Sequence, residues 1–167
     1  FAMLLLNKSV PLFERDKKSF AFLFDMNVLF EKFIGRIIKD IYKDVEIPKK
    51  AKSFEELHLK PDIIVNSENL IIDCKYKVIQ DGKIASREDR YQMYVYANNF
   101  KNIDTTMLLY PKHFNHNKDL DKKLILGEND KKVTLFMKSI DLELDGGCSY
   151  SEYIKELQNR VEKLQWN

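Results

Sequence analysis

The chain has 167 residues, of which 44% are hydrophobic and 32% charged, and its formal net charge at pH 7 is +2. This length suits one domain with a sizeable core, and the composition is typical of a globular protein rather than a disordered one. The apolar runs are shorter than the roughly 20 residues of a membrane helix, and the small net charge does not by itself indicate nucleic-acid binding. We therefore expect a soluble domain over residues 1–167.

The first 24 residues give only weak signals of secondary structure. Residues 1–7 are apolar and predict a short helix, which Pro11 limits, and charged residues 14–18 predict a loop. For residues 20–24 a strand and a direct lead into the next element both remain open. Because the sequence begins at Phe1, without an initiator methionine, we interpret it as part of a longer protein.

The strongest helical pattern follows Asp25, which is a plausible N-cap. Apolar residues recur there at helical spacing: Met26, Leu29, Phe30, Phe33, Ile34, Ile37, Ile38 and Ile41. Glu31 lies beside this stripe, either as an ordinary flanking charge or as part of a site. Residues 45–48 then predict an edge strand closed by its proline, and the small cluster of lysines at 49, 50 and 52 is interpreted as solvated.

Two short β-runs, at 63–65 and 70–72, predict a hairpin around the polar turn 66–69. If the turn is centred between Ser67 and Glu68, the facing pairs are Val65 with Leu70, Ile64 with Ile71, and Ile63 with Ile72. The next facing pair is Asp62 with Asp73. Because side chains alternate along a strand, Asp73 and Lys75 share one face, with Ile71, and Cys74 takes the other.

The chemistry of this hairpin points to a cation. Directly opposed carboxylates repel each other, and Mg²⁺ is typically held by one or two carboxylates together with phosphate oxygens of the substrate. Lys75 offsets part of the repulsion. The alternative is a solvated hairpin face that carries ordinary surface charges.

Residues 86–89 predict the start of a second helix, with acidic residues placed favourably against its dipole, and this helix continues to about Asn98. Gln92 and Tyr96 are four residues apart, so they project from one face. The alternative is a helix packed on the sheet with Tyr91, Tyr94 and Val95 turned inward.

The rest of the chain predicts strands and a closing helix. Residues 105–110 predict a strand ended by Pro111, residues 112–123 a loop that holds His113 and His116, and residues 124–126 and 133–144 a hairpin that turns at 128–130. Residues 151–165 predict an amphipathic helix. This order of elements predicts an α/β fold in which helices flank a mixed central β-sheet. Cys74 and Cys148 are interpreted as free thiols in a reducing compartment.

Four blocks of the sequence, in order, resemble the McrC family. They are Phe-Leu-Phe-Asp-Met-Asn and Leu-Phe-Glu within 22–31, Lys-Pro-Asp-Ile at 60–63, Asp-Cys-Lys-Tyr-Lys at 73–77 and Tyr-Gln-Met-Tyr at 91–94. Within them, Pro61-Asp62 and Asp73-Cys74-Lys75 form a pattern similar to that of the PD-(D/E)xK nuclease superfamily, with cysteine where alanine is common. The Gln92 and Tyr96 pair resembles a motif of RecB-like nucleases in this superfamily.

The resemblance implies a single restriction-endonuclease-like domain over residues 1–167, forming the C-terminal part of a longer McrC-like protein. It implies DNA cleavage with Mg²⁺, for which Mn²⁺ substitutes, in a McrBC-type restriction system whose partner is a McrB-type AAA+ GTPase. The implied site residues are, for catalysis, Asp62, Asp73, Lys75, Gln92 and Glu31; for metal binding, Asp62, Asp73 and the main-chain carbonyl of Cys74; and for DNA binding, Tyr96 and Lys77.

The resemblance also implies a cytoplasmic protein that oligomerises only through the partner complex. Two alternatives stay open at this stage. One is a stand-alone RecB-like nuclease. The other is a catalytically inactive nuclease-fold module that serves DNA binding or assembly.

Overall fold

A computed structural model describes residues 9–166 apart from 15–16, 23, 55, 80–82, 113–118, 129–131 and 145–146. For residues 9–22 and for Leu57 it describes the backbone alone. The helix predicted at 1–7, the two loop histidines at 113 and 116 and most of the turn at 128–130 lie outside the described residues.

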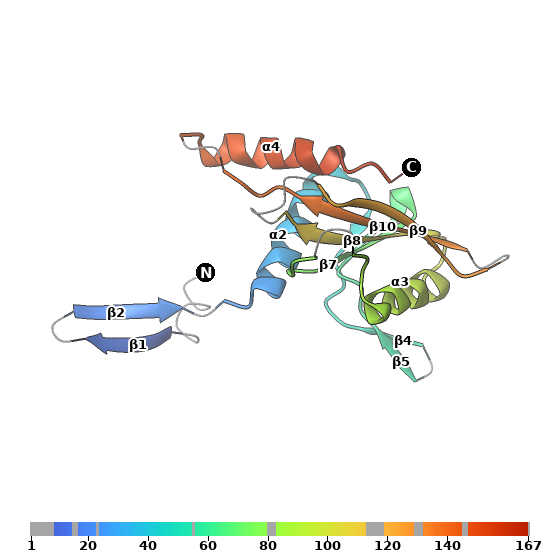
Figure 1. The fold of residues 1–167 in the computed structure, drawn as a ribbon, viewed down its shortest axis with the longest axis horizontal. Helices are drawn as coiled ribbons and strands as arrows, with labels where there is room; N and C mark the ends of the chain where they lie inside the picture. The colour runs from blue at the N-terminus through green and yellow to red at the C-terminus, as the bar shows by residue number, and fades with distance from the viewer. Residues whose placement is uncertain are drawn as a thin grey trace.

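The central element is a six-stranded sheet with the strand order β3-β6-β7-β8-β10-β9 (Figure 1). Its strands are β3 (Val45–Glu46), β6 (Ile63–Val65), β7 (Leu70–Cys74), β8 (Thr105–Pro111), β9 (Asp121–Leu126) and β10 (Val133–Ile140). β8 runs parallel to both β7 and β10, whereas the other neighbours are antiparallel. The sheet is therefore mixed, as predicted.

The hairpin of β6 and β7 has the predicted register. Its Cα partners are Ile63 with Ile72, Ile64 with Ile71, and Val65 with Leu70. The connection is a single 3₁₀ turn, η1 (Asn66–Glu68), and Asn69 follows it in the left-handed conformation, with φ of 51° and ψ of 35°. Asparagine is one of the few side chains that tolerate this conformation, so the turn closes without a glycine.

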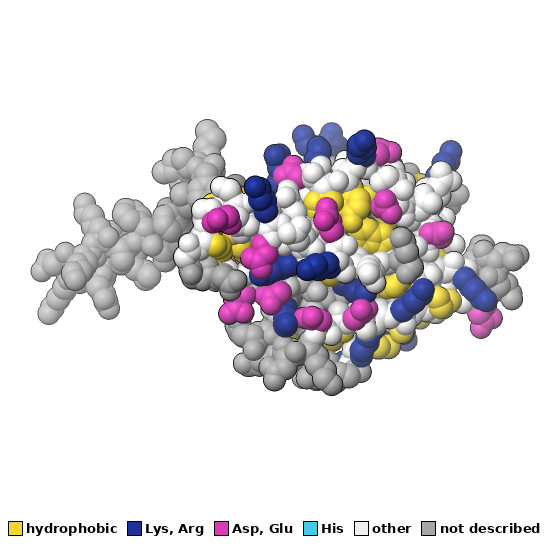
Figure 2. All heavy atoms as spheres, turned by 90° about the horizontal axis from the view of Figure 1, so that it is seen from above, with side chains coloured by type: hydrophobic (Ala, Val, Ile, Leu, Met, Phe, Trp, Pro, Cys, Tyr) yellow, Lys and Arg dark blue, Asp and Glu magenta, His cyan; other side chains and the backbone are white. Residues whose placement is uncertain are grey.

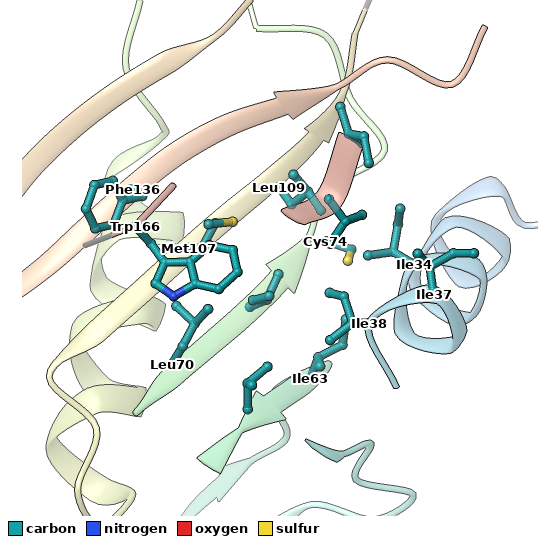
Figure 3. Close-up of a cluster of buried hydrophobic side chains, with 14 of the residues drawn as sticks. Ile34, Ile37, Ile38, Ile63, Leu70, Cys74, Met107, Leu109, Phe136 and Trp166 are labelled. Atoms are coloured by element: carbon teal, nitrogen blue, oxygen red, sulfur yellow. The ribbon is translucent and has the colours of Figure 1, made fainter. Parts of the chain in front are cut away.

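Helices cover both faces of the sheet (Figure 1). On one face α2 (Met26–Ile41) and α4 (Tyr150–Glu162) contribute to an apolar cluster in which Ile34, Ile37 and Ile38 lie near Ile63 and Cys74 (Figure 3). On the other face α3 (Arg87–Asn99) packs through Met93, Tyr96 and Ala97. This arrangement confirms the α/β class and is consistent with a restriction-endonuclease-like core.

The two faces divide the side chains of β7 as the alternation predicts. Leu70, Ile72 and Cys74 belong to the cluster under α2, whereas Ile71 belongs to the cluster under α3. Asp73 lies between Ile72 and Cys74 in sequence and so takes the α3 face. The charged residues of the motif therefore lie on the side of the sheet that α3 covers.

The helix ends follow their capping residues. Asp25 accepts hydrogen bonds from the amides of Asn27 and Val28, and Ser86 accepts one from the amide of Asp89. α4 begins with a complete capping box between Ser149 and Glu152. The predicted apolar stripe of α2 is wrong at its first turn, because the helix is buried only from Phe30 onward and its side chains before that residue are exposed.

Several strand boundaries differ from the prediction. Within the segment predicted as a loop at 14–18, the described residues Glu14, Lys17 and Lys18 lie in two antiparallel strands, β1 (Ser9–Glu14) and β2 (Lys17–Phe22). The pairing of β4 (Lys52–Phe54) with β5 (Leu57–Leu59) was not predicted. β9 begins inside the predicted loop at 112–123, and β10 ends at Ile140 rather than at 144. Polar edge strands are hard to recognise in a sequence, because backbone pairing rather than an apolar pattern holds them.

Charged side chains of both signs are interspersed on the face seen in Figure 2. This agrees with the small net charge of the chain. In the part of the chain that is described, no helix combines the length and the apolar character needed to cross a membrane.

Candidate active site

A hydrogen bond joins the two acidic parts of the motif. Asp62 directly precedes β6 and Asp73 lies in β7. The main-chain amide of Cys74 donates a hydrogen bond of 2.8 Å to Asp62 Oδ2. The structure thus brings Asp62 to the end of β7, beside Asp73, as the register of the hairpin predicts.

Burial makes both carboxylates difficult to ionise. Burial, with the charge of Asp73 as the next cause, raises the pKa of Asp62 from 3.8 to about 7, although the Cys74 amide acts in the opposite direction. Burial also raises the pKa of Asp73, in spite of the opposing charge of Lys75. Two crowded carboxylates in a partly desolvated site form an environment that favours an additional cation.

Lys75 follows β7 and points its ammonium group into this site. Its Nζ lies 2.7 Å from Asp73 Oδ2 and donates a hydrogen bond of 3.0 Å to Gln92 Oε1. Burial alone would lower the pKa of Lys75, but the charge of Asp73 and the contact with it more than compensate, so the pKa is raised. Lys75 is therefore a fixed positive charge at neutral pH.

Gln92 and Tyr96 on α3 connect Lys75 to the segment that precedes β6. Gln92 Nε2 donates a hydrogen bond of 2.8 Å to the Tyr96 hydroxyl, which donates one of 2.9 Å to the main-chain carbonyl of Lys60. These bonds form one chain from Lys75 to the residue just before Pro61. The Gln-x-x-x-Tyr pair thus links the two halves of the acidic motif.

Tyr96 is buried and only 3% exposed. Burial is the main cause that raises the pKa of Tyr96 to about 12, so its phenol is neutral and can donate. A ring in this position does not offer a face on which a DNA base could stack. Its surroundings favour a role in positioning Gln92 and Lys60 over the direct DNA contact predicted from the resemblance. The alternative inward set is wrong for Tyr91, which is 60% exposed.

Glu31 reaches the same region from α2. Its Oε1 lies 3.9 Å from Lys60 Nζ, and its charge contributes to the raised pKa values of both Asp62 and Asp73. The structure therefore brings Glu31 near the two aspartates, which the sequence alone left undecided.

Lys77 and Asp89 extend the site along the start of α3. The Lys77 ammonium group forms an ion pair and hydrogen bond with Asp89 Oδ2, and Asp89 Oδ1 lies 3.9 Å from Lys75 Nζ. Sequence reasoning placed Asp89 among the acidic residues that favour the helix dipole and missed its contact with the site. The only available signal was its position near the start of a helix that also carries Gln92.

The thiol of Cys74 lies on the opposite face, in the apolar cluster under α2 (Figure 3). Burial raises the pKa of this thiol well above its ordinary value, so the sulfur is neutral. Cys74 can therefore contribute to a metal site through its main chain but not as a thiolate.

The donor set fits a hard divalent ion only in part. Among the described residues, no three side chains of His, Cys, Asp or Glu gather closely enough to hold a metal by themselves. Asp73 Oδ2 is buried and has no hydrogen-bond partner among the described atoms, although it forms the ion pair with Lys75. Two neighbouring carboxylates suit Mg²⁺, which commonly takes its other ligands from water and from substrate phosphates.

Comparisons with known proteins identify one matching family and one structure with a similar fold. A family model described as "McrBC 5-methylcytosine restriction system component" matches residues 1–111 of the chain. A search of curated proteins gave no significant match.

Among solved structures, the chain is similar to one chain of a complex described as a refined half-complex from a tetradecameric assembly of Thermococcus gammatolerans McrB AAA+ hexamers with bound McrC. The TM-score is 0.59 and the identity 21%, over 87% of this chain and 35% of that chain. At this identity the similarity shows the fold, and the chain spans about a third of its relative's length.

Proposed function

Because the chain belongs to the family of McrBC 5-methylcytosine restriction system components, we propose that it is a Mg²⁺-dependent DNA endonuclease domain of such a system. The observation that carries this proposal is the meeting of Asp62, Asp73 and Lys75 at the end of β7. These residues supply two carboxylates that can hold a metal ion and a lysine ammonium group, which are groups used in the hydrolysis of phosphodiester bonds.

Each of these side chains has a task in the proposed reaction. Asp62 and Asp73, with the main-chain carbonyl of Cys74, would hold Mg²⁺. Bound Mg²⁺ supplies a water of lowered pKa and neutralises negative charge on the phosphate oxygens. Lys75 adds a compact positive charge that stabilises the same developing charge. The hydrogen bond from Lys75 to Gln92 keeps this ammonium group in place.

Two further residues border the site. Glu31 adds a third carboxylate on the side of α2, where it can orient water or a ligand of the ion. Lys77 follows Lys75 on the same segment, and its side chain is about half exposed, so it is placed to contact DNA phosphates. Phosphate contacts of this kind position DNA without reading its sequence.

We further infer that the domain acts with a McrB-type AAA+ partner driven by GTP, in the cytoplasm. The support is the family itself and the similarity to a chain from an assembly that is described as McrB AAA+ hexamers with bound McrC.

A plasmid-cleavage assay tests the proposed function. The parent chain, with and without the AAA+ partner and GTP, is compared in Mg²⁺, Mn²⁺ and EDTA with Asp73→Ala and Lys75→Ala. Each variant should lower the cleavage rate by at least about a hundredfold, because Asp73→Ala removes a proposed ligand of Mg²⁺ and Lys75→Ala removes a positive charge that stabilises the transition state. Asp40→Asn, an exposed aspartate on α2, serves as the matched control. Cleavage by Asp73→Ala at the parent rate would overturn the proposal.

This assay and a metal titration together separate the alternatives. Cleavage that needs no partner would favour a stand-alone RecB-like nuclease. An inactive module would neither cleave DNA nor bind Mn²⁺ in a manner that depends on Asp62 and Asp73, which calorimetric titration of the parent and of Asp62→Asn measures.

A further inference from the structure

We propose that Asp89 is a positioning residue whose buried carboxylate holds Lys75 and Lys77 in the orientation that DNA cleavage uses. The part of this inference that concerns cleavage rests on the proposed nuclease function. The part that concerns the two lysines rests on geometry alone.

The carboxylate of Asp89 contacts both lysines. It lies in the first turn of α3, is 8% exposed, and forms an ion pair with Lys77 while its other oxygen lies 3.9 Å from Lys75 Nζ. A buried carboxylate is costly unless cations or hydrogen bonds compensate for it. The two ammonium groups provide that compensation, so Asp89 and the segment after β7 constrain each other.

The neighbouring acid shows that helix capping alone does not explain this placement. Glu88 and Asp89 both lie in the first turn of α3, where either negative charge favours the helix dipole. Glu88 is exposed, whereas Asp89 is turned toward the lysines. A residue that served only the dipole would have no reason to be buried against two cations.

Asp89 also helps to fix the position of the Lys75 ammonium group in the site. Three groups surround it: Asp73 Oδ2 at 2.7 Å, Gln92 Oε1 at 3.0 Å and Asp89 Oδ1 at 3.9 Å. Without the negative charge of Asp89, Lys75 loses one of these three contacts and its ammonium group is held less firmly between β7 and α3. Lys77 loses its ion-pair partner at the same time.

The test compares Asp89→Asn with two other variants in the full chain. Glu88→Gln removes the same charge from the same helix turn without touching a lysine, and Asp89→Glu keeps the charge on a longer side chain. Steady-state cleavage of DNA in Mg²⁺ gives kcat and KM. Acylation of the metal-free proteins with acetic anhydride, followed by peptide mass spectrometry, gives the relative reactivity of Lys75 and Lys77.

Asp89→Asn should lower kcat by about ten- to a hundredfold, as expected for a displaced catalytic group, with a smaller change in KM. It should also increase acylation of both lysines several-fold. Glu88→Gln should match the parent in both measurements, and Asp89→Glu should recover part of the loss. If Asp89→Asn does not fold, Asp89→Glu is compared with Glu88→Gln in the same two measurements. The proposal then requires that kcat and lysine acylation change in Asp89→Glu and stay at the parent values in Glu88→Gln.

Two results would overturn the proposal. Unchanged acylation of Lys75 and Lys77 in Asp89→Asn would show that the carboxylate does not hold them. An equal fall of kcat in Glu88→Gln would assign the effect to the helix dipole. A parent that does not cleave DNA, combined with increased acylation in Asp89→Asn, would instead reject the nuclease function while leaving the hold of Asp89 on the lysines intact.

Discussion

The main-chain amide of Cys74 donates its hydrogen bond to Asp62 Oδ2, so the residue after one acidic position fixes the carboxylate of the other. The bond forms just beyond Ile63 and Ile72, the last paired residues of the hairpin. The proposed metal-binding carboxylates are therefore held by the sheet before any ion arrives. Preorganisation of this kind reduces the free energy that must be spent on ordering a site during binding or reaction.

The pKa of Asp62 predicts how pH affects the stability of the metal-free protein. Burial raises this pKa to about 7 in the folded chain, against 3.8 for an ordinary aspartate. The folded protein thus binds more protons than the unfolded one between these values, so its free energy of unfolding should fall as pH rises from about 4 to 7. Asp62→Asn should show a smaller fall. Urea unfolding in EDTA across this range checks the prediction, and parallel curves for the two proteins would contradict it.

At pH 8, added Mg²⁺ should restore the stability that the metal-free protein loses as pH rises. An ion that binds only the folded state raises stability according to its concentration and affinity, and it compensates the two carboxylates that repel each other. Thermal melting of the parent should shift upward with added Mg²⁺, by several degrees at saturation for a gain of about 1–2 kcal/mol. Asp62→Asn and Asp73→Asn should shift far less. An equal shift in all three proteins would place the ion elsewhere.

Gln92→Met should impair cleavage more than it impairs folding. The change keeps the length of the side chain but removes both the acceptor for Lys75 and the donor to Tyr96. We expect kcat to fall at least about tenfold because the ammonium group is no longer fixed. Asn98→Ala, on an exposed part of the same helix, is the control and should leave kcat unchanged.

Two buried tyrosines should respond differently to loss of their hydroxyl groups. The Tyr110 hydroxyl is buried and has no hydrogen-bond partner among the described atoms, so Tyr110→Phe should leave the free energy of unfolding unchanged or raise it by about 1 kcal/mol. Tyr96→Phe removes a hydroxyl with two partners and should lower it by about 1–2 kcal/mol. Denaturant unfolding of both variants measures the difference, and a loss in Tyr110→Phe as large as that in Tyr96→Phe would contradict it.

Local patterns in the sequence were sufficient for the hairpin and for the helix starts. The register of β6 and β7 follows from two apolar runs around a short polar turn, and the helices begin where Asp25 and Ser86 can cap them. The meeting of Asp62 with Asp73 follows from the same register. These features depend on neighbours in the chain, which the sequence displays directly.

Features that depend on tertiary packing were not predictable in this way. The inward turn of Asp89 depends on how α3 lies against the segment after β7, and the burial of Tyr96 depends on the carbonyl of Lys60. The polar strand β9 is ordered by its pairing with β10 rather than by its own side chains. Periodicity and spacing carry no information on such long-range partners.

The length of the connection between β6 and β7 decides which side of the sheet carries the charged chemistry. Side chains alternate along β7, so loss of one residue from 66–69 that shifts the register of β7 by one residue would turn Asp73 toward the isoleucines of α2 and Cys74 toward α3. The acid would then face hydrocarbon, away from Gln92 and Asp89 on α3, and the arrangement on which the proposed cation site depends would be lost. Redesign of this loop can therefore vary its composition, but it must preserve its residue count.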